Sequence, residues 1–225
     1  MRLIKRILLL AIIVIVAAAS IVIGQGYQMY LDAVEEISVE EKAAEIMEKE
    51  HYTTYDELPE TYIKAIIAAE DRRFLYHRGF DIISTARAAW RNIKSKEIVE
   101  GGSTITQQLG RIMYFSQEKK YSRKVAEVLV AGRIEELYEK EKILELYVNT
   151  IYFGSGYYSV YDASMGYFGK APSEMNDYEC TMLAGIPNAP SVYSPDVNPT
   201  LAEQRRQQVL VCMAEAGYIE PGEIE

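Results

Sequence analysis

The stretch AAEDRRFLYHRGFD, residues 68–81, carries a carboxylate where an apolar side chain is expected. Ile63 and Phe74 lie at helical spacings on either side of this carboxylate, which belongs to Glu70. The pattern predicts a helix over residues 60–76. Glu70 then lies on the apolar face of this helix, and that face must point either into the core or into a cleft.

Helical periodicity also dominates the rest of the chain. Further helices are predicted near residues 81–95, 104–114, 123–138, 140–149, 157–167, 176–185 and 200–215. No run of alternating apolar and polar residues predicts a large sheet. A chain of 225 residues is long enough to bury one sizeable core. The predicted fold class is therefore mainly α.

An uncharged stretch, residues 7–23, lies near the start of the chain. Its 17 residues span about 26 Å as a helix, close to the roughly 30 Å of a bilayer's hydrocarbon layer. Basic residues precede it and acidic residues follow, which predicts a cytoplasmic amino terminus and an extracytoplasmic remainder. A cleaved signal peptide is the alternative, because residues 17–20 resemble a cleavage site, but the length of the apolar run favours an uncleaved anchor.

The net charge of -9 is unevenly distributed. Residues 70–133 carry 13 basic and 7 acidic side chains, whereas the segments on both sides are acidic. A basic middle predicts either a locally held anionic ligand or one solvated basic face, and it argues against a nucleic-acid partner. Cys180 and Cys212 are too few for a disulfide scaffold, and the sequence leaves open whether they are bridged.

Glu70 is the first candidate for chemistry. A carboxylate on an apolar face loses solvation, so its pKa rises and it becomes a better proton acceptor near neutral pH. An ion pair with Arg72, Arg73 or Arg78 at the edge of the stripe is the alternative interpretation. His77 has only His51 as a second histidine, so we predict no metal held by histidines.

Two further segments combine polar and charged side chains. GGSTITQQL, residues 101–109, is a turn that leads into a helix, and a helix amino terminus suits a phosphate or a polar sugar face. Capping explains Thr104, but it does not explain Ser103 and the two glutamines together. In residues 123–127 two cations flank Glu127, which taken alone is an ordinary surface ion pair.

The order of these motifs resembles the peptidoglycan glycosyltransferases. The sequence has Glu-Asp-x-x-Phe-x-x-His-x-Gly at 70–79, Gly-Gly-Ser-Thr-x-Thr-Gln-Gln-Leu at 101–109 and Arg-Lys-x-x-Glu at 123–127. Further matches lie at 143–149, 152–154, 167–170 and 183–195, so the resemblance covers roughly residues 50–215. Ordered motifs at consistent spacings are specific, whereas any one of them alone is weak.

The resemblance implies a membrane-anchored enzyme that polymerises lipid II by inverting transfer, forming a β-1,4 linkage and releasing a polyprenyl pyrophosphate. It also implies a lysozyme-like helical head with a smaller membrane-proximal lobe, in a single-pass protein of the bacterial cell membrane whose catalytic domain is extracytoplasmic. No transpeptidase motif accompanies it, so a monofunctional enzyme is expected. The expected divisions are a cytoplasmic tail (1–6), a transmembrane anchor (7–23), an acidic stalk (24–50) and a glycosyltransferase domain (51–220).

Carried over residue by residue, the resemblance makes Glu70 the general base and Glu127 a second acidic residue that orients cations or helps to hold a divalent ion. The expected substrate-binding residues are Asp71, Phe74, His77, Ser103, Thr104, Gln107, Gln108, Arg111, Lys119, Arg123 and Lys124, of which the last four hold the pyrophosphate. The resemblance implies scaffold roles for Glu145, Tyr147 and Asn149.

The resemblance implies no obligatory cofactor, and it implies no set of metal-ligating residues. A Mg²⁺ or Mn²⁺ ion beside the pyrophosphate is compatible with it. The expected partners are lipid II, the growing lipid-linked strand and the membrane, with other cell-wall synthesis enzymes as further candidates and no nucleic acid. Residues 80–98 mix apolar and basic side chains, which fits either an anionic membrane interface or an ordinary packed helix.

The sequence departs from the family pattern at two of the pyrophosphate positions. Arg111-Ile112 stands where Lys-Asn is usual, and Lys119 stands where Arg is common. The charge is kept but the donor geometry is exchanged, which puts these two contacts in question. Two alternative functions therefore stay open, namely a cell-wall-cleaving enzyme on a similar scaffold and a catalytically silent anchored scaffold.

Overall fold

The computed structural model describes residues 2–95, 101–116, 120–220 and 222. These residues form helices and contain no strand, which confirms the mainly α class. In chain order the elements are α1 (Arg2–Glu36), α2 (Val39–Met47), η1 (Tyr55–Glu57), α3 (Glu60–Glu70), η2 (Phe74–Tyr76), α4 (Ile82–Ser95), α5 (Ile105–Tyr114), α6 (Tyr121–Leu137), α7 (Lys140–Val148), α8 (Val160–Phe168), η3 (Pro172–Glu174), α9 (Asp177–Gly185), η4 (Ile186–Asn188), α10 (Pro190–Tyr193) and α11 (Pro199–Glu215).

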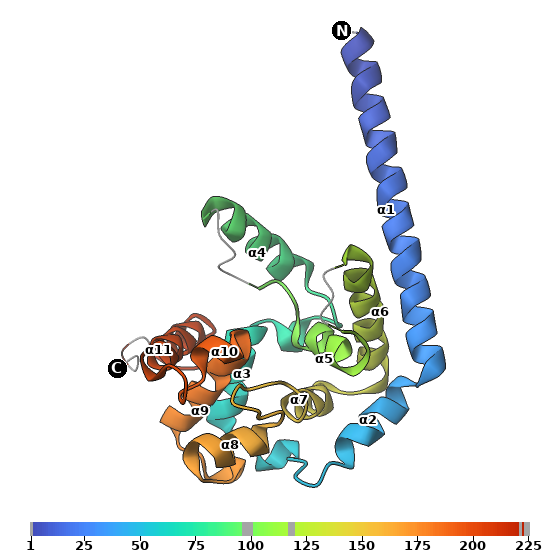
Figure 1. The fold of residues 1–225 in the computed structure, drawn as a ribbon. Helices are drawn as coiled ribbons and strands as arrows, with labels where there is room; N and C mark the ends of the chain where they lie inside the picture. The colour runs from blue at the N-terminus through green and yellow to red at the C-terminus, as the bar shows by residue number, and fades with distance from the viewer. Residues whose placement is uncertain (1, 96–100, 117–119, 221, 223–225) are drawn as a thin grey trace.

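Two groups of helices share one hydrophobic core. In the first group α3 packs against α9 and α11, and in the second α5 packs against α6 and α7 (Figure 1). Fully buried side chains from both groups form the centre, including Tyr62, Ile66, Leu109, Ile134, Leu146 and Leu183. This packing brings the carboxyl end of α3 next to α5, although almost 40 residues separate them in the sequence.

The long helix α1 has two parts with different surroundings. Its first part stands clear of the head (Figure 1), and its apolar side chains are exposed. Among the described residues it is the one helix long and apolar enough to cross a membrane. Its second part packs along α6, where a Cβ on Gly26 would lie 2.5 Å from the Cβ of Val125. The anchor segment and the head are thus joined without a break in the helix.

The segment predicted as an acidic stalk, residues 24–50, comprises the second part of α1 and then α2. Ser38 caps α2 by accepting a hydrogen bond from the backbone N–H of Glu41 at 3.2 Å. The apolar face of α2 contributes Val39, Ala43 and Ile46 to the core. This part of the stalk segment is therefore packed against the head.

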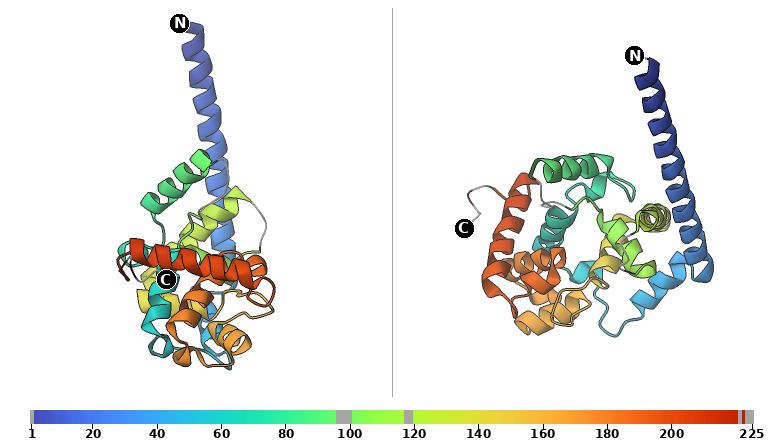
Figure 2. Two further views of the ribbon diagram at one scale, coloured as in Figure 1. Left: turned by 90° about the vertical axis from the view of Figure 1, so that its left-hand side faces the viewer. Right: turned by 45° about the horizontal axis from the view of Figure 1, so that its top comes forward.

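Helix α4 rises from the head on the side toward which α1 projects (Figures 1 and 2). The carboxylate of Asp81 caps the amino terminus of α4, where it accepts hydrogen bonds from the backbone N–H groups of Ile83 and Ser84 at 2.9 and 3.2 Å. One face of α4 is apolar and exposed, with Trp90 and Ile93 about 70 % accessible. Apart from the buried Ala88, the helix contributes little to the core.

The prediction of one helix over residues 60–76 is wrong. Helix α3 ends at Glu70, because Asp71 leaves the helical region with φ -155° and ψ 76°. The carboxylate of Asp71 instead contacts two groups distant along the chain, the Nε2 of His77 at 2.9 Å and the backbone N–H of Ile105 at 3.0 Å. Periodicity cannot reveal such tertiary contacts, so it extended the helix through Phe74, which lies in a short 3₁₀ turn.

Candidate active site

A cleft of about 960 Å³ opens between the carboxyl end of α3, α4, α5 and α11. Six of the predicted site residues line it, namely Glu70, Asp71, Ser103, Thr104, Gln108 and Arg111. They come from the carboxyl end of α3 and the residue that follows it, from the turn before α5, and from α5 itself. The core packing of α3 beside α5 is therefore what brings the first two sequence motifs together.

Glu70 brings an enclosed carboxylate oxygen to this cleft. Its Oε2 accepts a hydrogen bond from the Nε2 of Gln108 at 2.9 Å, and its Oε1 is buried without a hydrogen-bond partner among the described residues. Burial raises the pKa of Glu70. The hydrogen bond from Gln108 and the charge of Arg205 oppose this rise without cancelling it. The carboxylate is thus a stronger base than an exposed glutamate.

The amide of Gln108 also forms a hydrogen bond on the side away from Glu70. Its Oε1 accepts a hydrogen bond from the hydroxyl of Tyr147 at 3.2 Å, and Tyr147 is fully buried on α7. Gln108 therefore links Glu70, which lines the cleft, to Tyr147 in the core.

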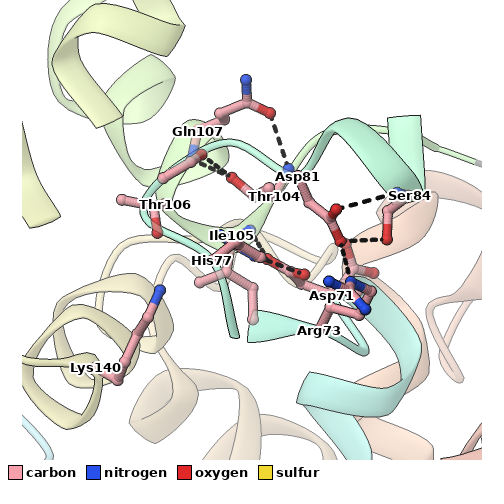
Figure 3. Close-up of polar contacts among 12 residues, drawn as sticks. Asp71, Arg73, His77, Asp81, Ser84, Thr104, Ile105, Thr106, Gln107 and Lys140 are labelled. Carbon is pink, nitrogen blue, oxygen red and sulfur yellow. Dashed lines mark hydrogen bonds and ion pairs between the residues drawn. The ribbon is translucent and has the colours of Figure 1, made fainter. Parts of the chain in front are cut away.

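Asp71, which lines the cleft, contacts His77, which does not (Figure 3). The bonds from Asp71 to His77 and to the backbone of Ile105 tie the loop after α3 to the amino terminus of α5. Phe74 is buried in the core, with the Lys140 ammonium 4.4 Å from the centre of its ring. Neither Phe74 nor His77 is among the residues that line the cleft.

Thr104 and Gln107 form the predicted capping box at the start of α5 (Figure 3). The Oγ1 of Thr104 accepts from the backbone N–H of Gln107 at 3.1 Å, and it donates to the carbonyl of Gly79 at 2.6 Å. The side chain of Gln107 accepts from the backbone N–H of Thr104 at 3.0 Å. Gln107 is fully buried and does not line the cleft, so its position fits capping rather than contact with a ligand.

The third motif lies on α6, one contact away from the cleft. Glu127 is buried and forms ion pairs with Arg123 and Lys124. The Lys124 ammonium also donates to the Oγ of Ser103 at 2.6 Å, and Ser103 lines the cleft. Lys119, the remaining predicted cation, lies outside the described residues.

The described part of the chain holds no group of three or more His, Cys, Asp or Glu side chains that fits a metal ion. The one acidic side chain of the third motif, Glu127, has both oxygens engaged by cations. These residues alone do not make a metal cage.

The cleft also contains residues that were not among the predicted site residues. They are four arginines and several amides, namely Arg72, Arg87, Arg91, Arg205, Asn188, Gln207 and Gln208. The excess of basic residues in 70–133 was a sequence signal that could have pointed to Arg72, Arg87 and Arg91. Arg205 lies in an acidic segment on α11, and only the packing of α11 against α3 brings it to the cleft.

Comparison with known proteins identifies the family to which this arrangement belongs. A family model described as transglycosylase matches residues 38–214. The chain belongs to the transglycosylase family. The matched range includes α2 as well as every helix around the cleft.

Two relatives illustrate the extent of the match. The chain is 45 % identical to penicillin-binding protein 1A of Aquifex aeolicus over 80 % of its own length and 25 % of that protein. It is 44 % identical to a putative transglycosylase of Cupriavidus necator, over 77 % of its own length and 75 % of that protein. The chain therefore spans a quarter of the larger relative and three quarters of the smaller one.

A crystal structure of penicillin-binding protein 1A from Haemophilus influenzae matches 77 % of this chain and 16 % of that chain, with 23 % identity and a TM-score of 0.45. That likeness is too low to support an argument about the site.

Proposed function

We propose that this transglycosylase-family protein is a peptidoglycan glycosyltransferase that polymerises lipid II. One observation carries the proposal, namely that an enclosed carboxylate, Glu70, and several arginines line the same cleft. Family membership supports the reaction class, and the cleft supports the division of roles given below.

Glu70 is the proposed general base. The transfer requires the 4-hydroxyl of a lipid II sugar to lose its proton as its oxygen attacks the anomeric carbon of the lipid-linked strand. A carboxylate whose pKa is raised by burial, and which has an oxygen without a partner among the described residues, is suited to accept that proton. Attack opposite an α-linked pyrophosphate inverts the configuration and gives the β-1,4 linkage.

The leaving group needs charge compensation more than it needs an acid. A pyrophosphate departs readily once its negative charge is balanced, and guanidinium groups balance it with paired hydrogen bonds. Arg111 lines the cleft, and Lys124 reaches its edge through Ser103. We therefore assign these cations, together with Arg123 and Lys119, to the pyrophosphate.

Glu127 is proposed to orient cations. Its carboxylate is buried between Arg123 and Lys124, so it fixes the direction of both side chains. Mg²⁺ usually keeps several waters and binds one or two carboxylates together with substrate phosphates. A divalent ion would therefore need the pyrophosphate as an additional ligand. Loss of glycan synthesis on adding a chelator would show that the ion is required.

The membrane is the proposed location of the substrate. Helix α1 supplies a candidate span, and α4 presents an exposed apolar face on the same side of the head. Arg87 and Arg91 of α4 line the cleft. This arrangement supports a head that takes its lipid-linked substrates at the bilayer surface. The basic residues before the apolar stretch and the acidic residues after it support an extracytoplasmic head. Other cell-wall synthesis enzymes are candidate partners.

Replacement of Glu70 by Gln tests the proposal directly. Glu70→Gln keeps the shape of the side chain and removes the base, so glycan synthesis from lipid II should fall by about 10²–10⁴-fold. The matched control is Glu60→Gln on the same helix, because Glu60 is exposed and forms an ion pair with Lys64. Lipid II polymerisation by the full chain in detergent is the measurement. Full activity of Glu70→Gln, or release of soluble fragments from isolated cell wall, would contradict the proposal.

A further inference from the structure

The contact between Gln108 and Tyr147 has a consequence for Glu70. The amide group of Gln108 has one end that donates and one end that accepts hydrogen bonds. Its Nε2 donates to the Oε2 of Glu70 at 2.9 Å, and its Oε1 accepts from the hydroxyl of Tyr147 at 3.2 Å. If the amide turned over, its oxygen would face an ionised carboxylate, and the Tyr147 hydroxyl would face the NH₂ group.

The burial of Tyr147 makes this contact directional. Its side chain is fully buried on α7, and burial raises the pKa of its hydroxyl well above the usual value, so the hydroxyl keeps its proton. A protonated hydroxyl beside the Oε1 of Gln108 favours the amide orientation in which the NH₂ group points at Glu70.

We propose that Tyr147 is a positioning residue for the general base, because its hydroxyl holds Gln108 in the orientation that stabilises the ionised form of Glu70. The sequence assigned Tyr147 to the scaffold. The inference rests on the proposed function, since Glu70 must be the proton acceptor for its ionisation to control the rate.

Several other groups act on the same carboxylate and must be kept constant. Arg111 on α5 and Arg205 on α11 bring positive charge, and the neighbouring Asp71 brings negative charge. Tyr62 on α3 is fully buried and interacts electrostatically with Glu70, but its hydroxyl has no hydrogen-bond partner among the described residues. Tyr62 therefore offers a matched control, a buried tyrosine near Glu70 that does not hold Gln108.

The test is the pH dependence of glycan synthesis. The base must be ionised, so kcat/KM falls on the acid side as Glu70 takes up a proton. In Tyr147→Phe the amide is free to turn, the ionised form of Glu70 loses a donor, and the acid limb should move to higher pH by roughly 0.5 to 1 unit. Tyr62→Phe should leave the limb where it is in the parent protein.

A double-mutant cycle identifies Gln108 as the intermediary. Gln108→Ala should move the acid limb in the same direction, and adding Tyr147→Phe to it should produce no further movement. The same cycle can be followed in the pH dependence of thermal unfolding, which reports the ionisation of Glu70 in variants with little activity.

The outcomes separate the inference from the proposed function. An unmoved acid limb in an active Tyr147→Phe protein, with only the plateau lowered, would show a packing role and overturn the inference. Equal shifts in Tyr147→Phe and Tyr62→Phe would overturn it as well. Absence of lipid II polymerisation by the parent protein would instead refute the proposed function, and the unfolding cycle would still decide whether Tyr147 acts on Glu70.

Discussion

Glu70 illustrates how a single residue can oppose folding where it serves chemistry. Its carboxylate lies at the end of a helix whose preceding residues, Ile66 and Ile67, are buried in the core. Burial raises its pKa in the folded protein, so between its unfolded and folded pKa values the folded state binds more protons than the unfolded state. Stability therefore falls as the pH rises through this interval.

The expected result is that Glu70→Gln is more stable than the parent protein at neutral pH. The difference should shrink toward acidic pH, because there the parent carboxyl is protonated in both states. Thermal unfolding of both proteins in the same detergent at several pH values is the measurement. A variant that is less stable than the parent at pH 7 would show that the ionised carboxylate is well accommodated, contrary to its enclosed position.

At the residue scale the sequence identified the enclosed carboxylate that we propose as the base, but it did not place all of the neighbours of that carboxylate. The apolar spacing around Glu70 was sufficient to predict a poorly solvated carboxylate. The same spacing placed Phe74 on one helix with it, although α3 ends at Glu70 and Phe74 lies in the core from a separate 3₁₀ turn. Arg205 was missed, since no local pattern shows that α11 crosses α3.

At the element scale, the amino terminus of α5 determines how the second motif is presented. The hydroxyl of Thr104 makes two hydrogen bonds there, one within the cap and one to the carbonyl of Gly79. Thr104→Ala should destabilise the protein by about 1–2 kcal/mol, since it removes a cap and leaves a buried carbonyl without its partner. Thr104→Ser is the control, because it keeps the hydroxyl. Urea unfolding distinguishes them, and equal stability of the Ala and Ser variants would contradict this role.

The packing of α1 on α6 gives a second expectation at this scale. Gly26 is buried against Val125 and Ser122, whereas a Cβ on Gly24 would meet no atom within 4 Å. Leu at either position gains a similar helix propensity, so the two variants differ mainly in packing. Gly26→Leu should destabilise the contact by about 1–3 kcal/mol and lower glycan synthesis, since α6 carries the proposed pyrophosphate cations. Gly24→Leu should not.

Limited proteolysis between α1 and α2 measures the loosened contact in these glycine variants, and a glycan synthesis assay measures the loss of activity. Indistinguishable cleavage and activity of the Gly24→Leu and Gly26→Leu proteins would contradict the expectation. The comparison is informative because both glycines lie in the same helix, two residues apart.

Helix bounds were predictable where capping residues mark them and not where a tertiary contact ends the helix. The capping boxes at Thr104 and Asn176 begin α5 and α9 within one residue of the predicted starts. By contrast, α3 ends six residues earlier than its periodicity indicated, because Asp71 is bound to the backbone of Ile105. The stalk segment was predicted from its acidic composition. The burial of Ala43 in this segment depends on packing against the head, which composition does not show.

At the scale of the whole molecule, α1 and α4 project on one side of the head (Figure 1). Trp90 on α4 is the single tryptophan of the chain and is 69 % exposed. If α4 rests at the membrane surface, the fluorescence of Trp90 should shift to shorter wavelength in bilayer nanodiscs and be quenched by brominated lipids. Equal emission in nanodiscs and in a hydrophilic detergent, without quenching, would show an ordinary surface helix.

The fold class was predictable for the whole molecule, whereas the cleft was only partly so. Helical periodicity recurs throughout the sequence, so a mainly α chain follows from local pattern alone. The walls of the cleft come from α3, α4 and α5, which follow one another along the chain, and from α11, which lies far from them in the sequence. The family resemblance brought Glu70 and the second motif together correctly, but the α11 side of the cleft required the packed structure.

The unbroken course of α1 has a mechanical consequence. Its apolar stretch ends at residue 23, and Gly26 in the same continuous helix is in close contact with α6, so no flexible linker separates the proposed span from the head. In a bilayer thinner than the roughly 26 Å of the apolar stretch, α1 must tilt, and the head must tilt with it. The inclination of the cleft toward the lipid surface, and with it the rate of synthesis, should therefore depend on the acyl-chain length of the surrounding lipids.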